Sequence, residues 1–234
     1  GQIYAAPLRV TLRLVIFDVD GTLVDSQADI LGAMTASFTA QGLEVPAREA
    51  VLSIVGLSLT EAMARLVPHL PVGLRDELVA GYKHAYMSAR LTSDTRQTSP
   101  LYPGARAVLD LLAAQPCTLL GVATGKSQRG LDALIASHGL EGLFLTRQVA
   151  DHHPSKPHPS MLLAALRETG VDPADAVMVG DTSYDMEMAR AAGICGIGVS
   201  WGYHAPAALK AASCVIDRFD ELPACLEEIW RIAA

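Results

Sequence analysis

The sequence predicts an α/β protein with a parallel β-sheet that is interrupted by a helical insert. Short apolar runs alternate with longer helical patterns, which is typical of β/α units that feed a parallel sheet. Between the first and the second run lie about a hundred residues without a strand signal, far more than a plain crossover needs. The chain has 234 residues, of which 50% are hydrophobic and 18% are charged, as in a folded globular protein.

The expected elements follow from these patterns. Strands are predicted at 12–17, 118–123, 143–145, 176–179, 194–199 and, more weakly, 214–216. The insert shows helical patterns at 26–41, 47–54, 58–66 and 74–91, and the third opens with the Ser58-x-x-Glu61 spacing of a capping box. An amphipathic closing helix is predicted at 219–232, with Leu222, Leu226 and Ile229 facing the sheet. We therefore predict a core formed by residues 1–24 and 99–234, and an all-helical cap formed by residues 25–98.

The charge and hydropathy of the chain argue against two classes of partner. With 25 acidic and 18 basic residues the net charge is −7, and no basic block is present that could neutralise nucleic-acid phosphates. No stretch reaches the ~18 apolar residues of a membrane span, and the opening segment lacks the apolar core of a signal peptide. We therefore expect neither nucleic acid nor membrane as a partner, and the pattern sets no oligomeric state.

The cysteines are expected to be reduced and packed. They fall at Cys117, Cys195, Cys214 and Cys225, without a C-x-x-C pair, and each lies in or beside apolar sequence. A cytoplasmic location follows as an expectation.

Candidate chemistry begins where the first predicted strand ends. Asp18 and Asp20 follow the apolar run and precede Gly21, and residues two apart on a strand point to the same side. Two adjacent carboxylates repel each other unless a cation or a shared proton compensates. A polar loop is an equally good interpretation of these residues alone, because Asp and Gly are ordinary turn residues.

Three later segments tip the balance. Thr124 and Gly125 end a second apolar run, where a hydroxyl and free N–H groups could bind a phosphate oxygen, although a strand-to-helix turn explains them as well. Lys156 precedes a proline at a predicted helix start, which is weak alone. Asp181 and Asp185 follow a third apolar run, where Asp181 could be an N-cap and Asp185 the partner of a Thr182 capping pair. The repetition favours a site, because open α/β sheets form their binding crevice at the carboxyl ends of their strands.

This ordered set resembles the four motifs of the haloacid dehalogenase-like hydrolase superfamily, especially its phosphoglycolate phosphatase-like branch, over residues 12 to about 217. The resemblance implies a Rossmann-like doubly wound parallel sheet with a mobile helical cap after the first motif. It also implies a Mg²⁺-dependent phosphatase that hydrolyses a small phosphate monoester, phosphoglycolate-like or a sugar phosphate. The sequence departs from many relatives in one place, because Gly125 stands where Asn is frequent.

Residue roles also follow from the resemblance. Asp18 would be the nucleophile that forms an aspartyl-phosphate, and Asp20 the general acid and base. Thr124 and Lys156 would hold the phosphoryl oxygens, with the segments at Asp20–Gly21 and Gly125 completing the phosphate site. Mg²⁺ would be bound by Asp18, Asp181 and the backbone carbonyl of Asp20, and Asp185 would support that metal site.

Two other functions remain open. A sugar phosphomutase similar to β-phosphoglucomutase would use the same core with a cap that excludes water, and a non-catalytic phosphate-ligand-binding domain would keep only the fold. Asp20 argues against dehalogenase and phosphonoacetaldehyde hydrolase chemistry, because the corresponding residue in those relatives is typically not acidic. The motifs leave phosphoglycolate, a sugar phosphate, pyrophosphate and a nucleotide monophosphate open as substrates.

Some polar residues outside the motifs are also assigned. Arg65 and Lys83 are the cap cations that we expect to contact substrate. Tyr82, His84 and Tyr86 are expected to divide between packing and solvent, because they lie two residues apart on one predicted helix. His152, His153 and His158 are expected to lie in a solvated loop, since no cysteine or regular ligand spacing accompanies them.

Overall fold

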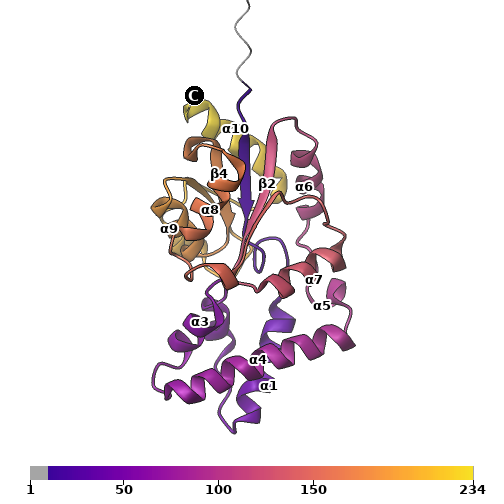
Figure 1. Cartoon of the computed structure of the whole chain (residues 1–234), viewed down its shortest axis with the longest axis vertical. Coiled ribbons are helices and arrows are strands. Elements are labelled where there is room, and N and C mark those ends of the chain that lie inside the picture. The colour runs from indigo at the N-terminus through magenta and orange to yellow at the C-terminus, as the bar shows by residue number, and fades with distance from the viewer. Residues whose placement is uncertain (1–9, 234) are drawn as a thin grey trace, which may run out of the picture.

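The computed structural model describes residues 10–233 and, in the last helix, side chains as far as Arg231. Its centre is a parallel sheet of six strands in the order β3-β2-β1-β4-β5-β6 (Figure 1). The strands are β1 (Arg13–Phe17), β2 (Thr118–Ala123), β3 (Thr146–Gln148), β4 (Ala176–Gly180), β5 (Cys195–Val199) and β6 (Cys214–Ile216). Successive strands extend outwards from β1 in both directions, which is the doubly wound arrangement.

Helices cover both faces of the sheet, so the central strands β1 and β4 are buried on both sides. Alternate residues of β1 point to opposite faces, so Val15 and Phe17 belong to one hydrophobic cluster and Leu14 and Ile16 to another. The first cluster is covered by α6 (Ala105–Ala113), α7 (Gln128–His138) and α10 (Leu222–Ala233), and the second by α8 (Ser160–Thr169) and α9 (Ser183–Ala191). The predicted α/β fold class is confirmed.

The chain between β1 and α6 contains helices, connecting turns and isolated β-bridges, but no strand. Its helices are α1 (Gln27–Ala40), α2 (Arg48–Ser53), α3 (Leu59–Leu66), α4 (Val72–Thr92) and the short α5 (Thr95–Thr98), which had no sequence signal. Met34, Phe38 and Leu78 are buried in a hydrophobic cluster formed almost entirely by this part of the chain. We call residues 25–98 the cap segment; their division from the core as a separate domain stays a prediction.

The two ends of the cap segment lie side by side. Val24 pairs with Leu101 in an antiparallel bridge, and the N–H of Asp25 donates to the carbonyl of Pro100 over 2.8 Å. Figure 1 shows the helices of this segment gathered beyond one end of the sheet. The two connections of the chain between the core and the cap segment therefore run side by side.

The predicted third strand is wrong in its position. The strand is Thr146–Gln148 and follows the predicted range 143–145. The apolar signal came from Phe144, which is buried in a turn, and from Leu145, which is 64% exposed. The strand itself is polar, and its buried side chains are hydrogen-bonded. The Thr146 hydroxyl donates to Glu168 over 2.7 Å, and the Gln148 amide donates to Thr146 over 2.8 Å. Side-chain hydrogen bonds thus replace the apolar pattern that identified the other strands.

The start of α3 also differs from the prediction. Ser58 is the N-cap residue, but its side chain accepts no capping hydrogen bond. Its backbone N–H instead donates to the hydroxyl of Ser155 over 3.0 Å, which ties the cap segment to the core. The helix boundary was therefore correct, and the capping box was wrong.

The expectation of reduced, packed cysteines is also wrong. Cys214 and Cys225 form a disulfide between β6 and α10, and Cys117 and Cys195 are free but exposed. Spacing alone did not indicate the pair, because its two members belong to different elements that meet only after folding. The reduced state was one ground for expecting a cytoplasmic location, and that ground is withdrawn.

The closing helix packs as predicted where its side chains are described. Leu222 and Leu226 are buried against the sheet, and Ile229 packs at the edge of the same cluster. The segment 219–221 forms a 3₁₀ turn, so α10 begins three residues later than the predicted range. Within residues 10–233, no helix combines the length and apolar character needed to cross a membrane.

Candidate active site

The polar residues predicted from the sequence meet at the carboxyl ends of three adjacent strands. Asp18 follows β1, Thr124 follows β2, and Asp181 follows β4. Phe17 is in register with both Val122 and Val179, so the three strands end at nearly the same level. The parallel sheet thus places three segments that are distant in sequence beside one another.

A buried charge cluster occupies this position. The Lys156 ammonium lies 3.1 Å from a carboxylate oxygen of Asp18 and 2.8 Å from one of Asp185. All three side chains are at most 2% exposed. The second oxygen of Asp18 has no hydrogen-bond partner within residues 10–231, whereas its first oxygen also accepts from the N–H of Val19 over 2.7 Å. Asp18 is therefore held through one oxygen and leaves the other available.

Asp181 is held by the segments around it. One carboxylate oxygen accepts from the hydroxyl of Thr22 over 2.9 Å, and the other accepts from the N–H of Tyr203 over 2.8 Å. Gly21 makes this approach feasible, because its φ of +81° is left-handed and a Cβ there would collide with the Asp181 carboxylate. The turn after β1 therefore needs glycine for its conformation and for space.

Asp185 has two structural tasks at once. It forms a capping box with Thr182 at the start of α9, and it also contacts Lys156 through its other oxygen. The capping interpretation was therefore correct for this pair, and the N-cap residue is Thr182, so Asp181 does not cap the helix. Capping and site support are compatible because a carboxylate has two oxygens.

The buried acids could hold a cation. Carboxylate oxygens of Asp18, Asp181 and Asp185 lie within 4.8 Å of one another. Three carboxylates against the single ammonium of Lys156 leave two excess negative charges when all are ionised, which a divalent cation would balance. An all-oxygen donor set fits a hard cation such as Mg²⁺.

Burial raises the pKa values of two acids in this cluster, Asp18 and Asp181. Burial, reinforced by repulsion from Asp185, raises the pKa of Asp18 well above its usual value, although Lys156 opposes the shift. Burial and the Asp185 carboxylate likewise raise the pKa of Asp181 to about 7. Burial alone would lower the pKa of Lys156, but the Asp18 and Asp185 carboxylates more than offset it and raise that pKa above its ordinary value. The Lys156 ammonium therefore stays charged, and a bound cation would favour the ionised forms of Asp18 and Asp181.

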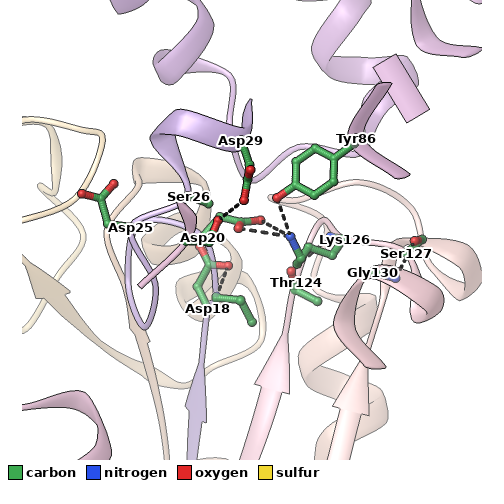
Figure 2. A network of polar contacts seen from close by, with 12 residues as sticks. Asp18, Asp20, Asp25, Ser26, Asp29, Tyr86, Thr124, Lys126, Ser127 and Gly130 are labelled. Atoms are coloured by element: carbon green, nitrogen blue, oxygen red, sulfur yellow. Dashed lines mark hydrogen bonds and ion pairs between the residues drawn. The ribbon is translucent and has the colours of Figure 1, made fainter. Parts of the chain in front are cut away.

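Asp20 lies apart from this cluster, at the boundary with the cap segment. Its carboxylate oxygens lie 3.3 and 3.4 Å from the Lys126 ammonium, and that ammonium also lies 3.4 Å from the Tyr86 hydroxyl on α4. Figure 2 shows Lys126 between the two side chains. Asp20 and Lys126 are mostly buried, with 14% and 9% of their side chains exposed. Lys126 therefore joins the second acid of the first motif to the cap segment.

The turn formed by Thr124 and Gly125 approaches the cap segment closely. The Thr124 hydroxyl accepts from the N–H of Lys126 over 3.1 Å, which orients the turn after β2. A Cβ on Gly125 would lie 2.5 Å from the carbonyl oxygen of Gly56 in the cap segment. Glycine in place of the more frequent Asn is thus matched to a close backbone approach in this chain.

The expectations for other polar residues have mixed outcomes. Lys83 lines the cavity between core and cap segment, whereas Arg65 packs over the ring of Tyr184 at 5.4 Å and does not line it. Tyr82 and Tyr86 pack in the hydrophobic cluster of the cap segment and His84 is exposed, as expected, and both tyrosines also line this cavity. In the histidine loop, the partly buried His153 ring lies 2.8 Å from Gln148 and 2.7 Å from Ser160.

Lys126 is the site residue that sequence reasoning passed over. The chain contains only four lysines, and Lys126 follows the Thr124-Gly125 turn directly. That scarcity was the available signal. The pairing with Asp20 depends on two loops that meet only in the folded sheet.

With this geometry in view, comparison with known proteins identifies the class. A model of the haloacid dehalogenase-like hydrolase family matches residues 15–199, so the chain belongs to this family. The probable phosphatase IndB of Dickeya dadantii is 36% identical over 226 residues, which cover 94% of this chain and 96% of that protein. A phosphoglycolate phosphatase of Rhodospirillum rubrum is 33% identical over 220 residues, covering 90% and 89% of the two chains. The predicted enzyme class is confirmed as a hydrolase of this family with relatives named phosphatases.

Solved structures agree in fold. A protein described as a predicted phosphoglycolate phosphatase from Haemophilus somnus has a TM-score of 0.81 at 23% identity, covering 93% of this chain and 99% of its own. A β-phosphoglucomutase from Clostridium difficile has a TM-score of 0.79 at 18% identity, covering 95% and 98%. These likenesses concern the fold, which phosphatases and phosphomutases share.

Proposed function

We propose that this chain is a Mg²⁺-dependent phosphatase that hydrolyses phosphate monoesters through an aspartyl-phosphate on Asp18. The observation that carries the proposal is the environment of that carboxylate. One oxygen is held by Lys156 and by the N–H of Val19, and the buried second oxygen has no hydrogen-bond partner among the described residues. A carboxylate with a fixed orientation and a free lone pair suits nucleophilic attack on phosphorus. The phosphatase names of the relatives support the same reaction.

The phosphoryl group would be held by Lys156, by the Thr124 hydroxyl and by N–H groups of the turns at Asp20–Gly21 and Gly125. Phosphoryl transfer depends mainly on positioning and on positive charge around the transferred group. Lys156 retains its charge in this site because two carboxylates contact it. The glycines allow the backbone to approach a ligand closely.

Asp18, Asp181 and the backbone carbonyl of Asp20 would hold Mg²⁺, with Asp185 supporting the site through Lys156 and Thr182. When bound, the ion supplies positive charge that reduces the repulsion between a carboxylate nucleophile and a phosphate dianion.

The proposed reaction has two steps. In the first, an Asp18 oxygen bonds to phosphorus, the bond from phosphorus to the ester oxygen breaks, and Asp20 gives its proton to the leaving alkoxide. In the second, Asp20 takes a proton from a water molecule that bonds to phosphorus, and the bond between phosphorus and Asp18 breaks. The products are an alcohol and inorganic phosphate, and both carboxyls return to their starting state.

Phosphate release tests this proposal directly. We expect hydrolysis of para-nitrophenyl phosphate with Mg²⁺, and loss of turnover by at least about a thousandfold in Asp18→Asn, because the amide is a far poorer nucleophile. Asp110→Asn is the matched control, since Asp110 is an exposed acid that pairs with Arg106 on the surface of α6. Full turnover in Asp18→Asn, with deamidation excluded by mass spectrometry, would remove Asp18 from the mechanism. Transfer of the phosphoryl group to a sugar phosphate without phosphate release would instead identify a phosphomutase.

A further inference from the structure

The space for the leaving group lies between the core and the cap segment. A cavity of about 510 Å³ is lined by Asp18 and Asp20 from the core and by residues of α1, α3 and α4 from the cap segment. Because the two carboxylates line it, an ester bound for attack by Asp18 would place its alcohol part in this cavity. The side chains that line the cavity therefore indicate which kind of alcohol it can hold.

Five buried side chains of the cap segment form an apolar part of the wall. Ile30, Met34, Val55, Leu57 and Tyr82 line the cavity and are each at most 8% exposed. Four cations also line it: Lys83 and Arg129 are exposed, Arg90 is partly buried, and Lys126, with 9% of its side chain exposed, already pairs with Asp20. A carboxylate placed against the five apolar side chains would lose its hydration without gaining a partner from them, which is costly. This apolar part of the wall therefore suits a hydrocarbon group better than a charged one.

The cavity is also large for a two-carbon alcohol. A cavity of about 150 Å³ holds one benzene molecule, and this one has a volume of about 510 Å³, more than three times as much. Glycolate, with two carbons, would leave most of it unfilled. Pockets that bind ligands tightly bury most of the ligand surface against such walls.

We propose that the ester preferred by this enzyme has a ring-bearing, largely apolar leaving group of the size of one to two aromatic rings. This inference rests on the proposed phosphatase function. The ring system contacts the buried side chains of the cap segment, while the phosphate lies at Asp18. A two-carbon acid phosphate fills too little of the cavity and leaves the apolar side chains without a contact.

A matched series of esters tests the preference. Naphthylmethyl phosphate, benzyl phosphate and phosphoglycolate all release a primary alkoxide, so a difference in leaving-group chemistry does not dominate the comparison. Since one methylene in an apolar pocket changes kcat/KM by roughly 10-fold or more, we expect naphthylmethyl phosphate to exceed phosphoglycolate in kcat/KM by about 100-fold. Equal or better use of phosphoglycolate would overturn this inference and leave the phosphatase proposal standing. Hydrolysis of para-nitrophenyl phosphate but of none of these three would also overturn this inference. Hydrolysis of none of the four by folded, Mg²⁺-supplied protein would overturn the phosphatase proposal itself.

Variants that narrow the cavity test whether the leaving group of the ester binds there. Met87→Trp on α4 and Ala62→Leu on α3 each add bulk at a lining residue, so each should lower kcat/KM for naphthylmethyl phosphate about tenfold and affect phosphoglycolate little. Leu91→Trp is the control, because Leu91 is 84% exposed on the same helix as Met87 and does not line the cavity. Thermal unfolding verifies that each variant is folded. An unchanged ratio of the two substrates in both narrowing variants would overturn the placement of the leaving group.

Discussion

Gly125 allows the core to approach the cap segment through backbone atoms alone, and Gly125→Ala should separate them. The added Cβ would lie 2.5 Å from the carbonyl oxygen of Gly56 and 2.9 Å from that of Leu57. Even weak C–H···O contacts need a C···O distance of about 3.3 Å. The cap segment must therefore move by roughly 0.8 Å, because backbone atoms on both sides leave no side-chain rotamer that could relieve the contact.

This displacement should be visible in catalysis. A misplacement of about 1 Å at a reacting centre costs on the order of 100-fold in rate, so we expect kcat/KM for the best ester to fall by roughly 50- to 100-fold. That loss corresponds to about 2.5 kcal/mol of transition-state stabilisation. The measurement is steady-state phosphate release at several ester concentrations, with thermal unfolding as a check on folding.

Gly32→Ala is the matched control for this substitution. Gly32 lies within α1, and a Cβ there would meet nothing within 4 Å. The substitution should leave kcat/KM unchanged and stabilise the protein by about 0.5–1 kcal/mol, because alanine loses less conformational freedom in a helix. Wild-type kcat/KM in folded Gly125→Ala would refute the inference that this close contact positions the cap segment.

Three other predictions concern the charged residues. Asp20→Asn should lower kcat far more than it raises KM, because proton transfer is felt in the transition state; steady-state kinetics that show a change in KM alone would reassign Asp20 to binding. Chelation should stop phosphate release and added Mg²⁺ should restore it, whereas Ca²⁺ should inhibit through its larger and looser coordination; full activity of metal-free protein would contradict this. Burial and the Asp185 carboxylate raise the pKa of Asp181 to about 7. Between pH 4 and pH 7 the metal-free native state therefore keeps a proton on Asp181 that the unfolded state has lost. The free energy of unfolding should consequently decline over this range, by on the order of 4 kcal/mol. Calorimetry in chelator at pH 5 and pH 8 measures the larger part of this decline, about 2.6 kcal/mol. A wild type that is more stable at pH 8 than at pH 5, relative to Asp181→Asn, would show the opposite sign.

Sequence patterns were sufficient where one physical signal dominated. The strands before Asp18 and Asp181 are buried on both faces and read as continuous apolar runs, so their positions were predicted to within a residue or two. The long α4 was predicted nearly at its observed bounds, since its length gives several turns of helical pattern. The gathering of Asp18, Thr124 and Asp181 followed from topology, because parallel strands place their carboxyl ends at one edge.

The patterns failed where the structure depends on partners distant in sequence. The polar strand Thr146–Gln148 is stabilised by the side chain of Glu168, which no local window contains. Ser58 starts its helix at the predicted place, but its backbone binds Ser155 of the core in place of a capping box. The disulfide between Cys214 and Cys225 is a further case, because its two elements meet only in the folded core.

The charged groups of the site fall into two sets that differ in their dependence on the cap segment. Lys156 contacts Asp18 and Asp185, which all belong to the core, so their arrangement does not require the cap segment. Lys126 contacts Asp20 of the core and the hydroxyl of Tyr86 on α4, so this second set includes a cap residue. Movement of α4 would therefore alter the surroundings of Asp20 while leaving those of Asp18 intact. In the proposed mechanism Asp18 attacks phosphorus and Asp20 protonates the leaving oxygen, so the step most sensitive to the alcohol is also the one that the cap segment reaches.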